Sequence, residues 1–595
     1  MGPVKPEPKV WDNSQVTKRR SFPTTFFPRR ARRLIGALLA LPIVAAAMPA
    51  GVSFGATTVE RLQIPFPQDD GSLTPYTFEL GYSLMTLVYD TLMWHDPDGI
   101  PQPWLARSIT ASPDGRAITV VLPPGVKWQD NVALTSADIA FTFRFIAAHP
   151  HPRFTPELVA VLAVETPDPL TAVIKLKTPS PGFLDQPLSD MPILPEHLWK
   201  DLPPGRVAPD GLPLGSGPYR LVRYLEKESY RFQANNEYFR GPPAVKFLEV
   251  PFINDAGKTF SSFETGKSDM IPVSLPAASV DRLQSIGTGI ARGPSYLGTV
   301  LMFNLRQPPF DKLEVRQAAA RSLDLSRIAQ QVGLATPAKR GYLHPSSRFA
   351  PSEDLPAGGG SGGSPALDGQ SVEVLAPDND PIKIEAGRQV VLALKRAGAS
   401  VVLRRLPRDE LSRTVGEDGS PPQFQAAIWS SSPLASYEPD FLRRVFGSNP
   451  TDATFNYAGY QNPDFDSLAD QISTTADPKL RQDAVTGALR LIATDTPVVP
   501  LFFSQGAFAF RQSRYKGWVF VKGSGILDKR SFEAPAAPDP SATASAPASL
   551  GPIGAESPDP TGPTSSGTSP FGLIGLGFVA AAVILGAVGF LRGRR

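Results

Sequence analysis

The stretch of residues 82–146 constrains the fold of this chain more than any other, because four recognisable local structures follow one another in it. Residues 82–92 carry leucine and valine at helical spacing, and the Asp-Pro-Asp-Gly run at 96–99 supplies a turn that ends the helix. Residues 117–122, between Pro-Asp-Gly and Pro-Pro-Gly, are rich in β-branched side chains and are predicted as a strand. Thr135 then caps a mostly buried helix. This order is far more specific than any one of its parts.

Two segments in this stretch resemble a known family. The runs YDTLMWHDPDGIPQPWLA and SPDGRAITVVLPPGVKWQDNVALTSADIAFTFRF are similar to the extracytoplasmic solute-binding proteins of ABC importers, in the family that includes the dipeptide, oligopeptide and nickel binding proteins. That family commonly has Gly after the Asp of one loop, where this chain has Asn131 after Asp130. Asn tolerates a left-handed backbone better than most residues, so we expect the turn to survive.

Shorter motifs extend the resemblance over most of residues 58–532. Gly-Ser-Gly-Pro-Tyr at 215–219 matches a turn that leads into a strand in the family, and Pro218 removes a backbone donor there, which favours a structural turn over a phosphate site. Residues 303–324 match the strand that crosses between two lobes in the family, together with the helix that follows it. The remaining matches lie at 235–243, 263–271, 424–432, 438–441, 456–466 and 497–502.

The resemblance implies an α/β protein with a bilobed type II periplasmic-binding-protein fold, mixed sheets and a hinge, which we place near Asn304. It divides the body into lobe I, residues 56–304 and 501–532, and lobe II, residues 305–500. Apart from the resemblance, residues 371–403 have the pattern of strand, helix and strand, and this spacing predicts a parallel α/β unit.

Cysteine is absent from all 595 residues. Disulfides, thiolate metal sites, thiol nucleophiles and a lipid-modified cysteine anchor are therefore excluded. The net charge of +3 is uneven, because residues 1–55 and the C-terminal arginines are basic and the body between them is acidic. Nothing in that body indicates a nucleic-acid partner, and its charges are expected to be solvated surface.

Residues 1–55 have the pattern of a signal peptide. A basic segment, residues 1–33, precedes an apolar run at 34–48 that is too short for a comfortable membrane span. Export is therefore expected. The general secretory route is favoured over the twin-arginine route, because Arg19-Arg20 lies well ahead of the apolar run.

The other end of the chain has the pattern of a membrane tether. Residues 533–570 are rich in Pro, Ala, Ser, Gly and Thr and are predicted to be a disordered linker. Residues 571–591 carry no charge and are long enough for a transmembrane helix, and the basic tail at 592–595 marks its cytoplasmic side. The binding body is therefore expected outside the cell, held at the cell membrane by one helix.

Motifs for catalysis and metal binding lack the context they need. A formal G-x-S-x-G at 359–363 lies in a Gly- and Ser-rich segment, without the buried strand that a nucleophile elbow requires. His149 and His151 flank Pro150 with no acidic residue beside them, which disfavours a metal site even though the resembled family includes nickel binders. No enzymatic activity, metal or cofactor is therefore expected.

The resemblance also supplies candidate ligand-binding residues. In the family the loop after the first strand lines the cleft, which makes Thr74 and Tyr76 candidates, with a solvated loop as the alternative. The family's peptide binders often hold the ligand's ammonium with an Asp four residues before the Pro of a D/E-P corner, and here Ala435 stands four residues before Pro439. The salt bridge is then lost unless Glu438 replaces it. The other candidates are Trp429, as a stacking wall or as core filler, and Ser430, Ser431, Ser432 and Tyr437, as hydrogen-bond donors.

Together these features predict a monomeric solute-binding protein that captures a peptide or a related small organic solute by hinge closure and delivers it to an ABC permease and its ATPase. A membrane-anchored extracellular sensor with the same binding fold stays open as the alternative. A permease encoded beside the chain would favour import, and a kinase or transducer would favour sensing.

Overall fold

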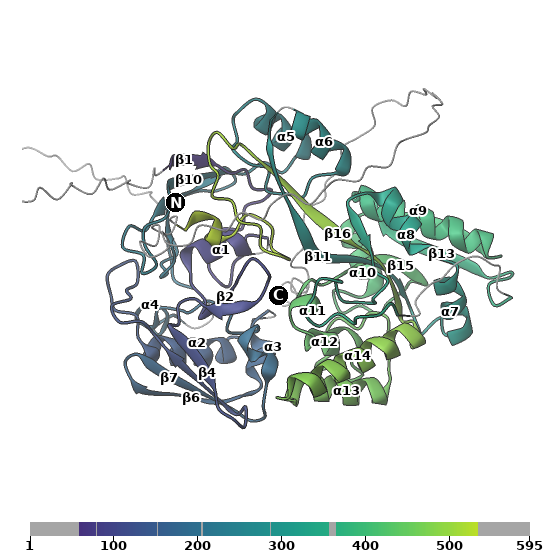
Figure 1. Cartoon of the computed structure of the whole chain (residues 1–595), viewed down its shortest axis with the longest axis horizontal. Coiled ribbons are helices and arrows are strands. Elements are labelled where there is room, and N and C mark those ends of the chain that lie inside the picture. Colours follow the sequence, from purple (N-terminus) through teal and green to yellow (C-terminus); the bar gives the residue numbers. More distant parts are fainter. Residues whose placement is uncertain are drawn as a thin grey trace, which may run out of the picture. The chain divides into compact units, whose positions relative to one another are not determined.

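The structure is a computed structural model that describes residues 59–533 (Figure 1), except for residues 79, 152, 204, 205, 207, 286 and 356–364. The predicted signal peptide, transmembrane helix and basic tail lie outside the described residues, as do the G-x-S-x-G run and all but the first residue of the predicted linker. In the part that is described, no helix combines the length and the apolar composition needed to cross a bilayer.

The first half of the described chain builds two four-stranded sheets and a small hairpin. Its elements are β1 (Val59–Gln63), α1 (Tyr82–Val88), β2 (Met93–His95), β3 (Pro101–Pro103), β4 (Ser108–Ala111), β5 (Ala117–Val121), α2 (Ser136–Ala148), α3 (Thr155–Leu158), β6 (Val161–Asp168), β7 (Thr171–Leu176), the 3₁₀ turn η1 (Pro181–Leu184), α4 (Glu196–Trp199), β8 (Tyr219–Leu225), β9 (Ser229–Ala234), β10 (Val245–Pro251), α5 (Ala256–Glu264) and α6 (Ala277–Ser285). One sheet has the order β1-β10-β9-β8, the other has the order β4-β5-β7-β6, and β2 pairs with β3. Only the β1-β10 pair is parallel among these strands.

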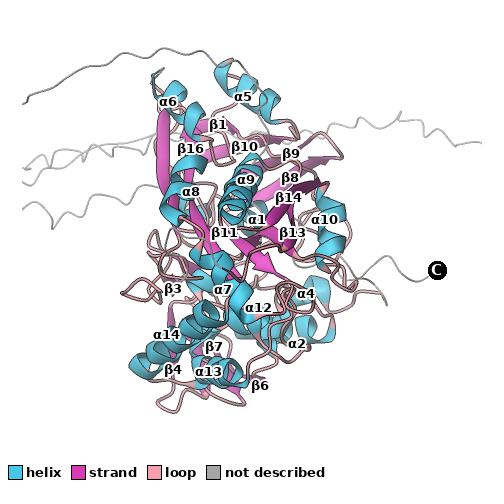
Figure 2. Cartoon of the chain, turned by 90° about the vertical axis from the view of Figure 1, so that its right-hand side faces the viewer, coloured by secondary structure: helices cyan, strands magenta, loops and turns pink. Residues whose placement is uncertain are grey.

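The second half builds a six-stranded mixed sheet with helices on both faces (Figure 2). Its elements are β11 (Gly289–Phe303), α7 (Leu313–Arg321), α8 (Leu325–Val332), β12 (Ala335–Pro337), β13 (Ser371–Pro377), α9 (Pro381–Arg396), β14 (Ser400–Leu406), α10 (Arg408–Val415), β15 (Ala426–Ser431), α11 (Leu434–Tyr437), α12 (Phe441–Phe446), α13 (Pro463–Thr474), α14 (Pro478–Asp495), β16 (Val498–Phe510) and the 3₁₀ turn η2 (Lys529–Phe532). The strand order is β12-β16-β11-β15-β13-β14. Side chains alternate along β11, so Leu301 and Phe303 join the core of α7, α8 and α9, whereas Val300 and Met302 join the core of α10, α12, α13 and α14.

Two long antiparallel strands, β11 and β16, run together from the neighbourhood of α5 and α6 into the six-stranded sheet (Figure 1). Their pairing extends from Gly289 opposite Phe510 to Met302 opposite Val498, and the register shifts between Pro294 and Gly298. Beyond that irregularity β11 also pairs with β15.

The buried apolar residues gather in separate cores along these two strands. The largest core draws on residues between 62 and 270 and between 508 and 532, whereas two others draw on residues between 300 and 502. A fourth, small core packs α5 and α6 against Ala507 and Ala509 of β16. Separate cores on one pair of strands are compatible with two lobes, whose boundaries stay a prediction.

The first helix of residues 82–146, α1, is shorter than predicted. It ends at Val88 instead of Leu92, because Tyr89 takes an extended backbone and the side chain of Asp90 turns inward to a buried partner. The carbonyl of Val88 accepts the amide of Gly217 at 2.8 Å, so the Gly-Ser-Gly turn packs on the end of this helix as a structural element.

The other local predictions for this region are confirmed. β5 takes in all of the predicted strand except Leu122, and α2 starts after Thr135, whose amide donates to Asp138 Oδ2 at 2.8 Å. Asn131 has a φ of 72°, in the left-handed region that the replaced glycine would also adopt. In the second half, β13, α9 and β14 form the predicted parallel unit.

A buried ion pair fixes the end of the described chain to the first half. Lys529 Nζ in η2 lies 3.1 Å from Asp90 Oδ1, and neither side chain is exposed to solvent. The rings of Trp94 and Trp104 cover the ammonium, with centroids 4.2 Å and 4.8 Å away. Burial lowers the pKa of Lys529, while the Asp90 carboxylate opposes that shift. The pair thus ties η2 to the segment that follows α1.

Candidate functional site

Tyr437 links the second half of the chain to the first. It ends α11, and its ring stacks on His95 of β2 with centroids 4.5 Å apart and planes inclined by 23°. Its hydroxyl donates to the carbonyl of Lys522 and lies 3.4 Å from Ser524 Oγ. Only 7% of the residue is exposed, so this contact closes an interface between segments that are far apart in the sequence.

Two further rings complete an aromatic cluster, which we define as His95, Tyr296, His344 and Tyr437. Tyr296 lies in the irregular part of β11, with a φ of 60°, and its ring meets that of Tyr437 edge-on at 5.1 Å. His344 packs on Tyr296 at 5.0 Å, and its Nδ1 accepts the amide of Ser346 at 2.9 Å. Burial lowers the pKa of His344 to about 4. This imidazole is therefore neutral at neutral pH and carries its proton on Nε2.

A buried charge cluster begins at the residue after Tyr437. Arg481 of α14 donates to Glu438 Oε1 and lies 3.4 Å from Asp440 Oδ1. Arg348 Nη2 is 3.8 Å from Glu438 Oε2, beyond hydrogen-bond distance. Burial and then the charge of Asp440 raise the pKa of Glu438 to about 8, although Arg481 opposes the shift. Two carboxylates thus share one buried guanidinium.

The turn η1 brings a third carboxylate to this cluster from the first half of the chain. Gly182 lies so close that a Cβ there would be 3.0 Å from Glu438 Cδ and would overlap Asp440 Oδ2. Asp185 follows the turn, and its Oδ1 lies 3.0 Å from His95 Nε2. The negative charge of Asp185 contributes to the raised pKa of Glu438, so the two carboxyl groups interact electrostatically across the interface.

Four buried polar atoms at this interface have no hydrogen-bond partner among the described residues. They are Asp185 Oδ2, His344 Nε2, Ser431 Oγ and Glu438 Oε2, all in residues that are at most 3% exposed. Folded proteins pair nearly all buried polar atoms, and an unpaired one costs about 1–3 kcal/mol. Their presence together marks this interface as the candidate binding site, because a polar ligand would supply the missing partners.

Ser431 reaches the site through its neighbours in the six-stranded sheet. It pairs with Gly298 of β11, and a Cβ at Gly298 would overlap Ser431 Oγ and lie 3.0 Å from the ring of Phe503. Phe503 in turn contacts His344, with ring centroids 5.0 Å apart. The other ligand-binding candidates of this segment, Trp429, Ser430 and Ser432, make different contacts.

The side chains of Trp429, Ser430 and Ser432 are not among those with an unpaired buried polar atom at this interface. The guanidinium of Arg408 lies 4.7 Å over the Trp429 ring, and Tyr457 meets that ring edge-on at 6.1 Å. Ser430 pairs with Thr299 in the sheet, and Ser432 Oγ accepts the amide that starts α11 at 3.2 Å. Their predicted contact with a ligand stays untested.

Thr74 and Tyr76 lie in a loop that packs on α2. Thr74 is buried and exchanges hydrogen bonds with Thr77, which shapes the loop. The Tyr76 hydroxyl donates to the carbonyl of His149 at 2.8 Å, and its ring contacts Phe145, His151 and Trp199. The structure therefore brings Tyr437, Glu438 and Ser431 together, whereas Thr74 and Tyr76 belong to a different part of the first half.

The two neighbouring histidines, His149 and His151, are occupied by local contacts. His149 Nδ1 lies 3.0 Å from the carbonyl of Phe145, and burial lowers the pKa of His151 to about 4. Within residues 59–533, leaving aside the undescribed positions, no group of three or more His, Asp or Glu side chains is arranged to hold a metal ion.

Sequence reasoning missed four residues of the candidate site: His95, Asp185, Tyr296 and His344. His95 lies in the first of the two segments that resemble the family, directly before the Asp-Pro-Asp-Gly turn. This position is the one sequence signal that could have identified it as a site residue. The other three lie outside any motif and are brought together only by tertiary contacts.

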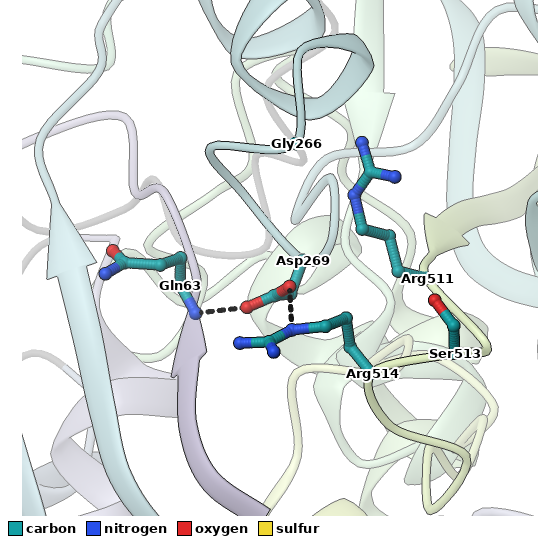
Figure 3. Close-up of a pocket in the computed structure, with 6 residues that line it drawn as sticks. All are labelled: Gln63, Gly266, Asp269, Arg511, Ser513 and Arg514. Carbon is teal, nitrogen blue, oxygen red and sulfur yellow. Dashed lines mark hydrogen bonds and ion pairs between the residues drawn. The ribbon is translucent and has the colours of Figure 1, made fainter.

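An open cavity of about 420 Å³ lies elsewhere, between β1, the corner after α5 and the segment after β16 (Figure 3). It is lined by Gln63, Gly266, Asp269, Arg511, Ser513 and Arg514. Asp269 accepts the amide of Gln63 at 2.7 Å and pairs with Arg514 at 3.1 Å (Figure 3). Arg511 donates to main-chain carbonyls of Phe263 and Ser268. These bonds join three chain segments, so the cavity is a structural junction rather than the leading candidate for a solute.

The central part of the chain has recognisable relatives. Residues 101–452 match the family model described as bacterial extracellular solute-binding proteins, family 5 Middle. Brucella proteins that carry the name ABC transporter peptide-binding protein, among them those of B. ovis and B. abortus, are 30% identical over 324 residues. That match covers 53% of this chain and 60% of the relatives, less than two thirds of their length. The oligopeptide-binding protein AppA of Bacillus subtilis is 25% identical over 446 residues, 69% of this chain and 79% of that protein.

Solved structures share the fold. The ABC transporter substrate binding protein CtaP of Listeria monocytogenes superimposes with a TM-score of 0.70 at 21% identity, over 80% of this chain and 99% of that chain. AppA of B. subtilis in complex with a nonapeptide gives 0.67 at 20% identity, over 81% and 100%. NikA of Brucella suis in complex with Fe(III)-EDTA gives 0.69 at 20% identity, over 80% and 100%. The described chain thus has the mixed-sheet α/β fold of periplasmic binding proteins.

Proposed function

This chain belongs to the bacterial extracellular solute-binding proteins, family 5, and from that premise we propose that it captures a peptide or a related small organic solute outside the cell and delivers it to an ABC permease and its ATPase. The names of its Brucella and Bacillus relatives support a peptide as the solute. The protein acts by binding and shape change, without catalysis.

The four unpaired polar atoms at the Tyr437 interface carry this proposal. Closing the interface without a solute leaves these atoms desolvated, at a cost of about 1–3 kcal/mol each. A polar solute supplies partners for them, so the closed arrangement becomes favourable when the solute is bound. Closure that depends on the solute lets a permease distinguish a loaded binding protein from an empty one.

The movement is centred on β11 and β16. Their pairing is irregular between Pro294 and Gly298, where Tyr296 takes a positive φ, so fewer ladder hydrogen bonds oppose bending there. Asn304, which follows β11, is fully buried and donates to the carbonyl of Phe424 at 3.0 Å. It anchors the boundary between the two predicted lobes, and the bend lies a few residues before it.

The position of the body relative to the membrane is inferred from the sequence. Residues 1–55 direct export, and residues 571–591 hold the monomeric body at the outer face of the cell membrane through the linker at 533–570. This arrangement keeps the binding protein close to its permease after it releases the solute.

Thermal denaturation of the full-length chain in detergent, with peptide and sugar libraries, tests the proposed function. When the free concentration of the solute is 100 times its Kd, binding stabilises the folded protein by about 2.7 kcal/mol. This raises the melting temperature by several degrees. We expect a subset of peptides to give this shift. An absence of stabilisation by any peptide or sugar would contradict the proposal.

Reconstitution with the permease separates import from sensing. The loaded protein should stimulate ATP hydrolysis by the permease complex and drive uptake of the solute into vesicles. If a peptide binds but neither activity follows, and a membrane kinase or transducer responds instead, the protein is a sensor.

A further inference from the structure

We propose that the open cavity of about 420 Å³ between β1, the corner after α5 and the segment after β16 is a binding site for a phosphate group (Figure 3). The charges that line this cavity favour an anion. Two guanidinium groups, those of Arg511 and Arg514, stand against one carboxylate, that of Asp269. Asp269 Oδ2 accepts the amide of Gln63 at 2.7 Å and Oδ1 pairs with Arg514 at 3.1 Å, so both oxygens are already bonded. One guanidinium charge is left over.

That charge belongs to Arg511, which forms no ion pair with any carboxylate of the residues that the structure describes. Its Nε–H donates to the carbonyl of Ser268 at 3.1 Å, and Nη2 donates to the carbonyl of Phe263. These bonds use two of the five N–H groups of the guanidinium, which leaves three for a ligand. The carbonyl end of α5 carries about half a negative charge, so it reduces the positive charge of Arg511 without cancelling it.

Arg511 is held in position before an anion arrives. Besides its two bonds to carbonyls, its guanidinium lies over the ring of Phe263, 4.8 Å from the centroid. Gly266, with a φ of 79°, forms the corner after α5, and a Cβ there would lie 3.8 Å from Arg511 Nη2. The glycine therefore leaves the guanidinium uncovered on this side. A side chain that is already fixed loses little conformational freedom when it binds a ligand.

Neutral donors from two chain segments complete the site. Ser513, in the turn after β16, and the side-chain amide of Gln63, at the end of β1, both line the cavity. Neither side chain makes a hydrogen bond to another residue of the described part of the chain. A phosphate group presents several strong acceptor oxygens, and a guanidinium binds two of them at once. Donors on separate segments thus suit a tetrahedral oxyanion better than a planar carboxylate.

A phosphate group can reach this cavity from two sources. Inorganic phosphate and soluble phosphate esters arrive from solution, whereas the head group of an anionic lipid arrives from the membrane to which the chain is predicted to be tethered. The arginine chemistry is the same for both. The site shares no residue with the interface around Tyr437, so it is independent of the proposed solute.

Phosphorus NMR of the full-length chain, in a detergent that contains no phosphorus, tests the site. The two probes are inorganic phosphate and glycerophosphoglycerol, the soluble head group of phosphatidylglycerol. Each is titrated at constant ionic strength in a chloride buffer, and the broadening of its resonance gives Kd. The variants are Arg511→Met and Ser513→Ala. Arg388→Met is the control, because Arg388 lies on α9, is 61% exposed and pairs with Glu385 at 3.4 Å.

We expect saturable binding of at least one probe to the wild-type protein, with a Kd of about 1 mM or lower. The affinity should fall at least tenfold in Arg511→Met and about two- to fivefold in Ser513→Ala, and it should not change in Arg388→Met. Tighter binding of inorganic phosphate would assign the ligand to solution, and tighter binding of glycerophosphoglycerol would assign it to a lipid.

The absence of saturable binding of both probes to the wild-type protein would overturn the site. Wild-type affinity in either Arg511→Met or Ser513→Ala would overturn it as well. Ser513→Ala keeps the test decisive if Arg511→Met does not fold, because the serine side chain is exposed and bonds to no described residue.

Discussion

The rings of Tyr437 and His95 stack across the interface between the two halves of the chain, with centroids 4.5 Å apart. Tyr437 ends a helix beside the six-stranded sheet, whereas His95 belongs to the small β2-β3 hairpin. Because their only covalent connection runs through the long strands, bending of those strands would separate the rings. In the proposed hinge movement, the stacked pair therefore marks the closed arrangement.

Tyr437→Ala should lower the affinity for the solute by at least tenfold, since it removes the ring that closes the interface and the hydroxyl bond to the Lys522 carbonyl. Tyr437→Phe keeps the ring and loses only that bond, which predicts a loss of about two- to tenfold. Calorimetric titration of the best peptide from the thermal screen measures both changes.

Tyr457→Phe is the control for this pair, because Tyr457 contacts Trp429 rather than the aromatic cluster. It should leave the affinity unchanged. Wild-type affinity in Tyr437→Ala would show that the stacked pair does not contribute to solute binding.

Lys529→Met should destabilise the protein by about 3–5 kcal/mol. The substitution removes one partner of a fully buried ion pair and leaves the Asp90 carboxylate without its cation. Urea denaturation of the full-length chain measures the change in the free energy of unfolding.

The matched control for this substitution is Lys246→Met. Lys246 pairs with Glu60 at 3.2 Å, but both side chains are more than half exposed, so the expected loss is at most about 1 kcal/mol. Equal effects of the two substitutions would contradict a structural role for the buried pair.

Local structure was predictable where residue chemistry decides it. The strand at 117–122, the cap at Thr135, the left-handed Asn131 and the parallel unit from β13 to β14 all follow from short-range rules. The end of α1 was not predictable, because Asp90 leaves the helical pattern to meet Lys529, a partner more than four hundred positions away.

The candidate site was predictable only in part, for a related reason. Glu438 belongs to the D/E-P corner and Tyr437 directly precedes it, so both could be selected from the sequence. Asp185 and His344 have no sequence context, and their importance arises from burial and from unpaired atoms that only tertiary structure reveals. The contacts of Tyr76 with the described residues lie at α2 and its neighbours, and its predicted contact with a ligand stays a prediction.

Removal of residues 534–595 should release the body from the membrane. The truncated chain keeps every residue that the structure describes, so its affinity for the solute should match that of the full-length chain. Fractionation of cells, followed by titration of the released protein, measures both. A truncated chain that stays in the membrane fraction would contradict the predicted tether.

The stability of the folded protein should fall as the pH rises from about 4.5 to about 8. Glu438 has a pKa of about 8 in the folded protein, against an ordinary value of 4.5, so the native state binds a proton in this window that the unfolded state does not. The contribution of Glu438 is fully present below the window and is lost across it, by up to about 1.4 kcal/mol per pH unit. Urea denaturation between pH 5 and pH 9 measures this slope.

Glu438→Gln should flatten that dependence. The charged groups that face Glu438 are Asp440, Arg481, Arg348 and Asp185, and the raised pKa of Asp440 has the same sign, so a smaller slope should remain. An unchanged slope in Glu438→Gln would assign the pH dependence to other groups.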